Sequence, residues 1–100
     1  MSGFDDLLAT LPRLKVAAFL SGCEQADFTT VADACGLSRP TLSKTVLTLE
    51  EAGYVRVRKG HVGRRPRTWL SLTSDGAAAF DGHMSAVRLL AAHAGQDLPG

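Results

Sequence analysis

The chain has 100 residues, of which 45% are hydrophobic, so it is long enough for one folded domain and too apolar for a disordered tail. Its formal net charge at pH 7 is only +1, which by itself indicates no class of partner. Asp5 and Asp6 stand where a secretion signal would carry cations, and no apolar stretch approaches the length of a membrane span. We therefore expect a cytoplasmic protein with no membrane partner and with reduced cysteines.

The first part of the chain is predicted to form two helices. Apolar residues recur at helical spacing from Phe4 to Leu11, which indicates one or two helical turns. A second helix is expected from Pro12 to Leu20, where a broad apolar face precedes the stop signal at Gly22. The second of these helices is interpreted as scaffold.

A helix-turn-helix is predicted at about residues 29–53. Thr29 or Thr30 can cap its first helix, and Gly36 can close that helix in the left-handed conformation. Ser38 is a favourable N-cap for the second helix, which Gly53 is expected to end. An apolar stripe spaced i, i+4, i+7 faces inward on this second helix, and Leu47 is also interpreted as packing.

A β-hairpin is predicted next, at about residues 54–72, because apolar and polar side chains alternate there. The stretch from Lys59 to Arg67 contains two glycines and a proline, so it is expected to be a loop too long for a two-residue turn. Tyr54 and Trp69 are interpreted as packing residues. Thr73 can cap a final helix at about residues 74–93. The order of elements predicts an α+β fold that is mostly helical.

Positive charge is concentrated in the hairpin. Six of the eleven lysines and arginines lie between Arg56 and Arg67, and no acidic residue occurs from Ala52 to Ser74. A nearly neutral protein with one such segment is suited to a polyanion. The second helix of a DNA-binding helix-turn-helix enters the major groove, and loop arginines can enter a minor groove. The predicted recognition-helix contacts are Ser38, Arg39, Thr41, Ser43, Lys44 and Thr48. The predicted wing contacts are Lys59, His61, Arg64, Arg65 and Arg67.

Several stretches resemble a known family. Gly-Leu-Ser at 36–38, Leu-Ser at 42–43 and Leu-Glu-Glu-Ala-Gly-Tyr-Val at 49–55 resemble the recognition half of a winged helix regulator. Residues 63–69 and 72–76 resemble the wing and the start of the last helix in small stand-alone winged helix-turn-helix proteins related to MarR-like and ArsR-like regulators. The resemblance implies a homodimer joined by its terminal helices. It also implies sequence-specific binding to double-stranded DNA as a transcriptional regulator.

The sequence supports a dimer independently of the resemblance. The last predicted helix is apolar on more than half of its circumference, which is wider than one small core needs. A face left uncovered needs a partner, and two-fold pairing is the commonest solution. The predicted dimer contacts are Phe4, Leu7, Leu8, Leu11, Phe80, Met84, Val87 and Leu90.

No catalytic, metal or cofactor site is expected. Cys35 is predicted to be buried and Cys23 lies near a glycine-containing loop, while the three histidines share no ligand spacing and the cysteine cluster of ArsR-like metal sensors is absent. No residues form a recognisable enzymatic constellation. Two alternatives remain open: a winged helix that docks onto another protein, and a non-specific architectural DNA binder. A small-molecule effector would have to bind between helices or at the dimer interface, since no separate sensor domain is expected.

Overall fold

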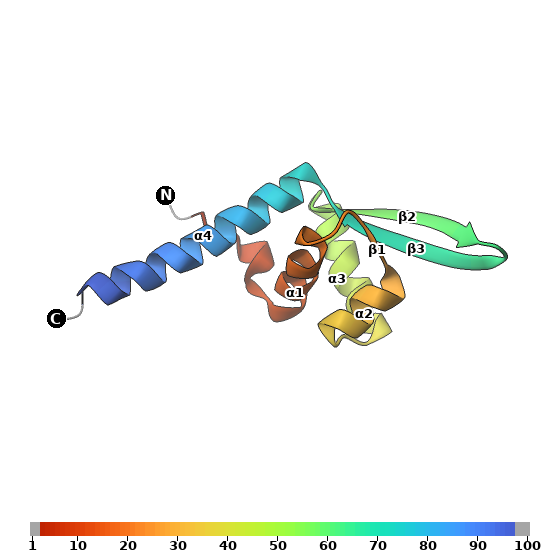
Figure 1. The fold of residues 1–100 in the computed structure, drawn as a ribbon, viewed down its shortest axis with the longest axis horizontal. Helices are drawn as coiled ribbons and strands as arrows, with labels where there is room; N and C mark the ends of the chain where they lie inside the picture. The colour runs from red at the N-terminus through yellow and green to blue at the C-terminus, as the bar shows by residue number, and fades with distance from the viewer. Residues whose placement is uncertain (1–2, 98–100) are drawn as a thin grey trace.

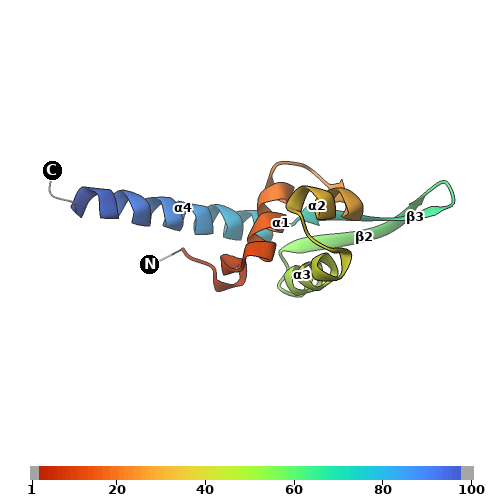
Figure 2. The same ribbon diagram turned by 90° about the horizontal axis from the view of Figure 1, so that it is seen from below.

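The computed structural model describes residues 3–97, with helices packed around a hydrophobic core and a small antiparallel sheet (Figure 1). The long axis of the molecule measures 63 Å and the other two 24 and 21 Å. A hairpin projects from one side of the body and the last helix from the other (Figure 2). The elements in chain order are the short 3₁₀ helix η1 (Asp6–Ala9), α1 (Leu11–Ser21), β1 (Ala26–Asp27), α2 (Phe28–Cys35), α3 (Arg39–Glu51), β2 (Val55–Val62), β3 (Arg65–Leu72) and α4 (Ser74–Asp97).

The core lies where α1, α2 and α3 meet the base of the sheet. Leu20 of α1, Val31 of α2 and Leu42 of α3 are fully buried there, together with Leu70 of β3. Each helix contributes one apolar side, as its periodicity predicts. The α+β, mostly helical fold expected from the sequence is confirmed.

The sheet has the order β1-β3-β2, with both pairs antiparallel. The sequence analysis did not predict β1, whose two residues pair with Trp69 and Leu70 of β3. The N-cap expected at Thr29 or Thr30 was also wrong. The side chain of Asp27 caps α2 instead, because it accepts a hydrogen bond from the Thr30 backbone N–H at 2.9 Å.

The turn of the hairpin is shorter than the sequence predicted. β2 and β3 pair continuously from Val55–Leu72 to Val62–Arg65, so Gly63 and Arg64 form a two-residue turn. Gly63 has φ +63°, a backbone conformation that glycine adopts without steric cost. Most of the expected loop is therefore strand, and its side chains alternate between two faces.

The last helix is longer than predicted, since it continues to Asp97. Its start is as expected: the Thr73 hydroxyl accepts a hydrogen bond from the Gly76 N–H at 3.0 Å. The Tyr54 hydroxyl donates to the Asp5 carboxylate, and the Asp5 N–H donates to Nδ1 of His83 in α4 at 3.0 Å. These bonds tie the N-terminal segment to both the hairpin base and α4.

Candidate nucleic-acid interface

The turn between α2 and α3 sets the direction of α3. Gly36 ends α2 with φ +66°, and its N–H and that of Leu37 bond the last carbonyls of α2. Ser38 then caps α3, accepting a hydrogen bond from the Thr41 N–H at 3.3 Å, with Pro40 in the first turn. These are the local features that the sequence predicted for a helix-turn-helix.

The outward side of α3 is free to contact a ligand. Leu42 and Leu49 are fully buried, while Ser43, Lys44 and Leu47 are exposed on the opposite side. Leu47 is 55% exposed, so its interpretation as a packing residue was wrong. Its spacing from Ser43 and Lys44, four and three residues, was the signal that could have placed it on their face.

The two predicted contact threonines are partly engaged within α3 itself. The Thr41 hydroxyl accepts a hydrogen bond from Ser38 Oγ at 2.9 Å. The Thr48 hydroxyl donates to the Lys44 carbonyl at 3.1 Å, and Thr48 is only half-exposed at the edge of the helix face. The exposed side chains of the outward face that make no such contact are therefore Ser43, Lys44 and Leu47.

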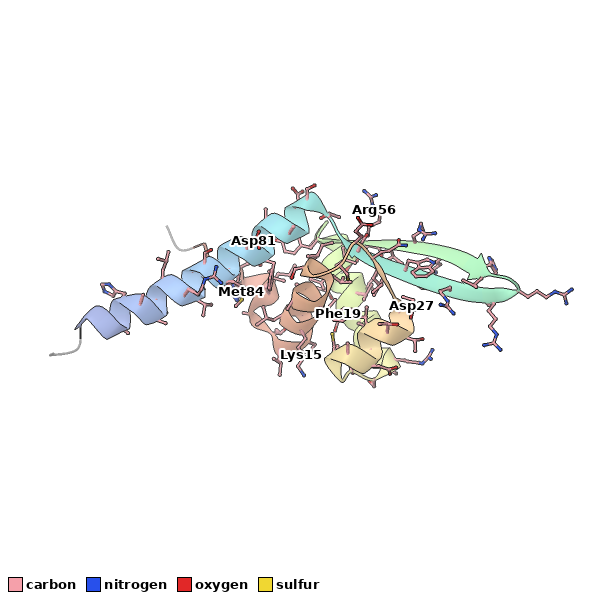
Figure 3. The ribbon with its side chains drawn as sticks, viewed as in Figure 1. Lys15, Phe19, Asp27, Arg56, Asp81 and Met84 are labelled. Carbon is pink, nitrogen blue, oxygen red and sulfur yellow. The ribbon has the colours of Figure 1, made fainter. Side chains whose placement is uncertain are left out.

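Strand alternation divides the cations of the hairpin between its two faces. Directly paired residues share a face, so Lys59 and His61 lie on the side of Val57, which contacts the core. Arg65 and Arg67 lie on the other side with Arg58 and Arg56. Figure 3 shows Arg56 projecting from the hairpin on the side away from α2. The turn residue Arg64 lies at the exposed tip.

The base of the hairpin is held by an arginine stack on Trp69. The guanidinium carbons of Arg58 and Arg67 lie 5.6 and 5.7 Å from the centroid of the indole ring. Such cation–π contacts contribute about 0.5–1 kcal/mol each at exposed sites. Arg58 also donates to Gln25 at 3.3 Å, and Arg67 forms an ion pair with Asp27 at 3.5 Å. These contacts hold the positively charged hairpin at a set angle to the body.

Two hollows lie between the helix-turn-helix and the hairpin. The first, of about 360 Å³, lies between α3 and the sheet and is bordered by Ser43, Leu47 and Lys59. The second, of about 470 Å³, lies between the start of α2 and β3, and we call it the α2–wing cleft. Its lining residues are Asp27, Phe28, Thr29, Thr30, Arg39, Arg65, Pro66, Arg67 and Thr68. These two hollows bring together Arg39 and Ser43 of the predicted recognition residues with Lys59, Arg65 and Arg67 of the predicted wing residues. Lys44 and Thr48 line a separate hollow beside the start of α1.

Comparison with known proteins identifies the family. The winged helix DNA-binding domain model matches residues 12–91. The chain belongs to this winged helix family. A transcriptional regulator homologue from Pyrococcus horikoshii OT3 has the same fold, with a TM-score of 0.79 and 27% identity, covering 92% of this chain and 89% of that one.

The winged helix fold is also that of longer regulators. A MarR-family transcriptional regulator from Silicibacter pomeroyi matches with a TM-score of 0.68 and 22% identity, over 93% of this chain and 62% of that protein. The PcaV transcriptional regulator from Streptomyces coelicolor, in complex with its natural ligand, matches with a TM-score of 0.73 and 24% identity. The match covers 92% of this chain and 64% of that protein. This chain is a small winged helix protein that shares the fold of MarR-family regulators.

The predicted dimer residues of this winged helix protein fall into two groups. Leu8 is 1% exposed and packs in the core of the protomer, so its placement at an interface was wrong. Leu7 and Phe80 also pack against the core, and Met84 is half-buried. The exposed members are Phe4, Leu11, Val87 and Leu90, to which the structure adds Leu89 at 70% exposure.

The cysteines offer no ligand site in the described part of the winged helix domain. Burial raises the pKa of the Cys35 thiol, so that thiol stays protonated at neutral pH. Cys23 is exposed, as its position near a loop indicated. Among residues 3–97, no three His, Cys, Asp or Glu side chains are grouped so that they could hold a metal ion. No helix in the same range is long and apolar enough to cross a lipid bilayer.

Proposed function

We propose that this winged helix protein binds double-stranded DNA at specific sequences as a homodimeric transcriptional regulator. One observation carries the proposal. Residues of α3 and of the hairpin line both hollows, whose linings together hold four cations and two acidic residues, so the two elements meet in a region of net positive charge. Family membership supports DNA binding as the use of that surface.

In this proposal α3 enters the major groove, which is wide enough for one helix. Ser43 and Lys44 supply hydrogen bonds to base edges or phosphates, and Leu47 supplies an apolar contact suited to a thymine methyl group. A well-formed base contact discriminates by about 1–3 kcal/mol. Arg64 and Arg65 at the hairpin tip reach the neighbouring backbone or minor groove, where a narrow groove attracts arginine.

The dimer is proposed to form through α4. The helix has 24 residues, about 36 Å at 1.5 Å per residue, and every described residue from Val87 to Gly95 is exposed. Val87, Leu89 and Leu90 therefore carry an apolar surface beyond the reach of the core. Burying these side chains against a second α4 removes them from water, and each fully buried leucine or valine contributes about 1.5–3 kcal/mol.

A small-molecule effector is a further element of the proposal. It is supported by the PcaV regulator, which shares this fold and is in complex with its natural ligand. The dimer interface or the space between helices would provide the effector site in this chain. Binding there would act on DNA affinity only if the effector distinguished between two arrangements of the DNA-contacting surface.

The proposal is tested by selecting duplexes from a random-sequence library with the purified protein at near-physiological salt. We expect a motif with two-fold symmetry whose half-sites lie about 10–10.5 base pairs apart, one helical turn. Recovery without sequence enrichment would indicate the architectural binder, and no recovery would favour the protein-docking module. Leu47→Ala is the matched variant: it should change the preferred bases but not the salt dependence, because it removes no charge.

A further inference from the structure

We infer that the α2–wing cleft is a phosphate-binding site that holds one phosphodiester of the DNA backbone, and that Arg39 is a phosphate contact and not a base-reading residue. This inference rests on the proposed function and assigns a separate role to one part of its surface. It departs from the expectation that Arg39, at the start of the recognition helix, reads bases.

The position of Arg39 directs it into the cleft. Arg39 lies one turn before Ser43, on the side of α3 that faces the hairpin, and it lines the cleft with Arg65 and Arg67 of β3. Its Nη2 donates a hydrogen bond to Thr29 Oγ1 of α2 at 3.4 Å. The guanidinium thus bridges the two helices, whereas Lys44 and Leu47 are exposed on α3 and do not line this cleft.

The charges in the cleft leave an excess that suits an anion. Asp27 is its one acidic lining residue, and the hydrogen bond from the Thr30 N–H lowers the pKa of that carboxyl, with Arg67 contributing. Asp27 is therefore ionised at neutral pH and pairs with Arg67 at 3.5 Å. Arg39 and Arg65 have no such acidic partner among the described residues, so two positive charges remain for a ligand.

One wall of the cleft is an open sheet edge. β1 ends at Asp27, opposite Trp69, so the edge of β3 from Arg65 to Thr68 has no further strand beside it within residues 3–97. A hollow of about 470 Å³ between this edge and α2 has room for a phosphate group and part of its sugar. Arginine is the side chain best matched to phosphate, since its planar fork can donate two parallel hydrogen bonds.

The experiment measures affinity for one selected duplex as a function of salt, together with the base preference of each variant. Arg39→Ala removes one phosphate contact from each protomer, so it should lower the salt slope of the dimer by about 1.8, which makes the variant lose about 12-fold less affinity than wild type between 50 and 200 mM salt. Its preferred sequence should stay the same. Arg39→Lys should keep the slope because it keeps the charge. Arg56→Ala is the control for net charge, because Arg56 lies in β2, on the far side of β3 from β1, and does not line the cleft.

A methylphosphonate scan locates the phosphate. Replacing one charged phosphate at a time by an uncharged methylphosphonate should reveal a position where wild type loses affinity and Arg39→Ala loses none. An unchanged slope together with a changed base preference would overturn the inference, and so would the absence of any such position. Both results require wild type to bind DNA, so they are distinct from failure of the proposed function, in which wild type binds none.

The two sources of phosphate are separated by an NMR titration with inorganic phosphate and then with duplex. Backbone amides of Thr29, Thr30 and Thr68 should shift with phosphate, and the duplex should displace it. If phosphate shifts these amides but bound duplex leaves the phosphate in place, the cleft takes a free anion and the DNA assignment fails.

Discussion

Gly76 stands at the tightest contact between α4 and the hairpin base. A Cβ atom built on Gly76 would lie 2.1 Å from the Tyr54 carbonyl oxygen and 2.9 Å from its carbon. That carbonyl accepts a hydrogen bond from the Thr73 N–H at 3.0 Å, and the Thr73 hydroxyl donates to the Gly53 carbonyl. The added methyl group can enter only if the start of α4 moves and strains these bonds.

For Gly76→Ala, the two opposing effects differ in size. Alanine gains about 1 kcal/mol in helix propensity. Overpacking at this distance costs about 3 kcal/mol, the upper end of the usual range, and a weakened hydrogen bond costs about 1 kcal/mol more. The net loss is about 3 kcal/mol of unfolding free energy, or roughly 12–24 °C in Tm for a domain of this size.

The assay is thermal and urea unfolding followed by circular dichroism at one protein concentration, since the proposed dimerisation would make Tm depend on concentration. Gly95→Ala is the matched control: it lies in the same helix with no atom within 4 Å of the added Cβ. It should raise stability by up to about 1 kcal/mol through helix propensity alone. A Gly76→Ala variant as stable as wild type would refute the reasoning about this contact.

Three further predictions concern the hairpin, the dimer and the N-terminal segment. Arg65→Ala should weaken binding to every duplex alike and lower the salt slope by about 0.9 per protomer, or about 1.8 for the dimer, and an unchanged slope would exclude a wing contact with the backbone. Leu90→Glu should give monomers by sedimentation with the helical spectrum retained, because Leu90 is 59% exposed; a dimer of unchanged affinity would exclude this part of α4 from the interface. The hydrogen bond to Asp5 raises the pKa of the Tyr54 hydroxyl, so it stabilises the fold below the unfolded pKa of about 10, and that contribution is lost as pH rises through the folded value. Tyr54→Phe should therefore be about 1 kcal/mol less stable at pH 7, with the deficit shrinking above pH 10; an equal deficit in urea unfolding at pH 7 and 11 would contradict this.

The helix-turn-helix could be predicted because its signals are local. Ser38 caps α3 and Gly36 ends α2 through hydrogen bonds to residues a few positions away. The cap of α2 could not be chosen in this way. Asp27 and Thr29 are both favourable caps, and the choice depends on β1, whose pairing with β3 is distant in sequence.

The outer half of the hairpin was mistaken for a loop because glycine and proline usually interrupt strands. Here Gly63 supplies the turn, and Pro66 lies in β3 opposite His61, beyond the part of β3 that β1 covers. Proline is tolerated at an edge because it lacks only an N–H that needs no partner there. The strand register depends on the whole sheet, so composition alone could not assign each arginine to a face.

The residues proposed to contact DNA were predictable by type more than by role. Lys44 and Arg65 are exposed as expected, since charged side chains rarely pack in a core. The exposure of Leu47 was not predicted, because an isolated leucine in a helix usually packs. The direction of Arg39 follows from Thr29 and the α2–wing cleft, which exist only once α2, α3 and β3 are assembled.

α3 and the hairpin together are proposed to form the DNA-binding surface. The most direct measurement is a ¹H–¹⁵N NMR titration of the 10.6 kDa chain with a selected duplex. We predict the largest amide shifts over residues 38–47 and 59–67, with little change over residues 87–95. Shifts confined to α4, or no shifts at DNA concentrations that saturate binding in other assays, would contradict the claim.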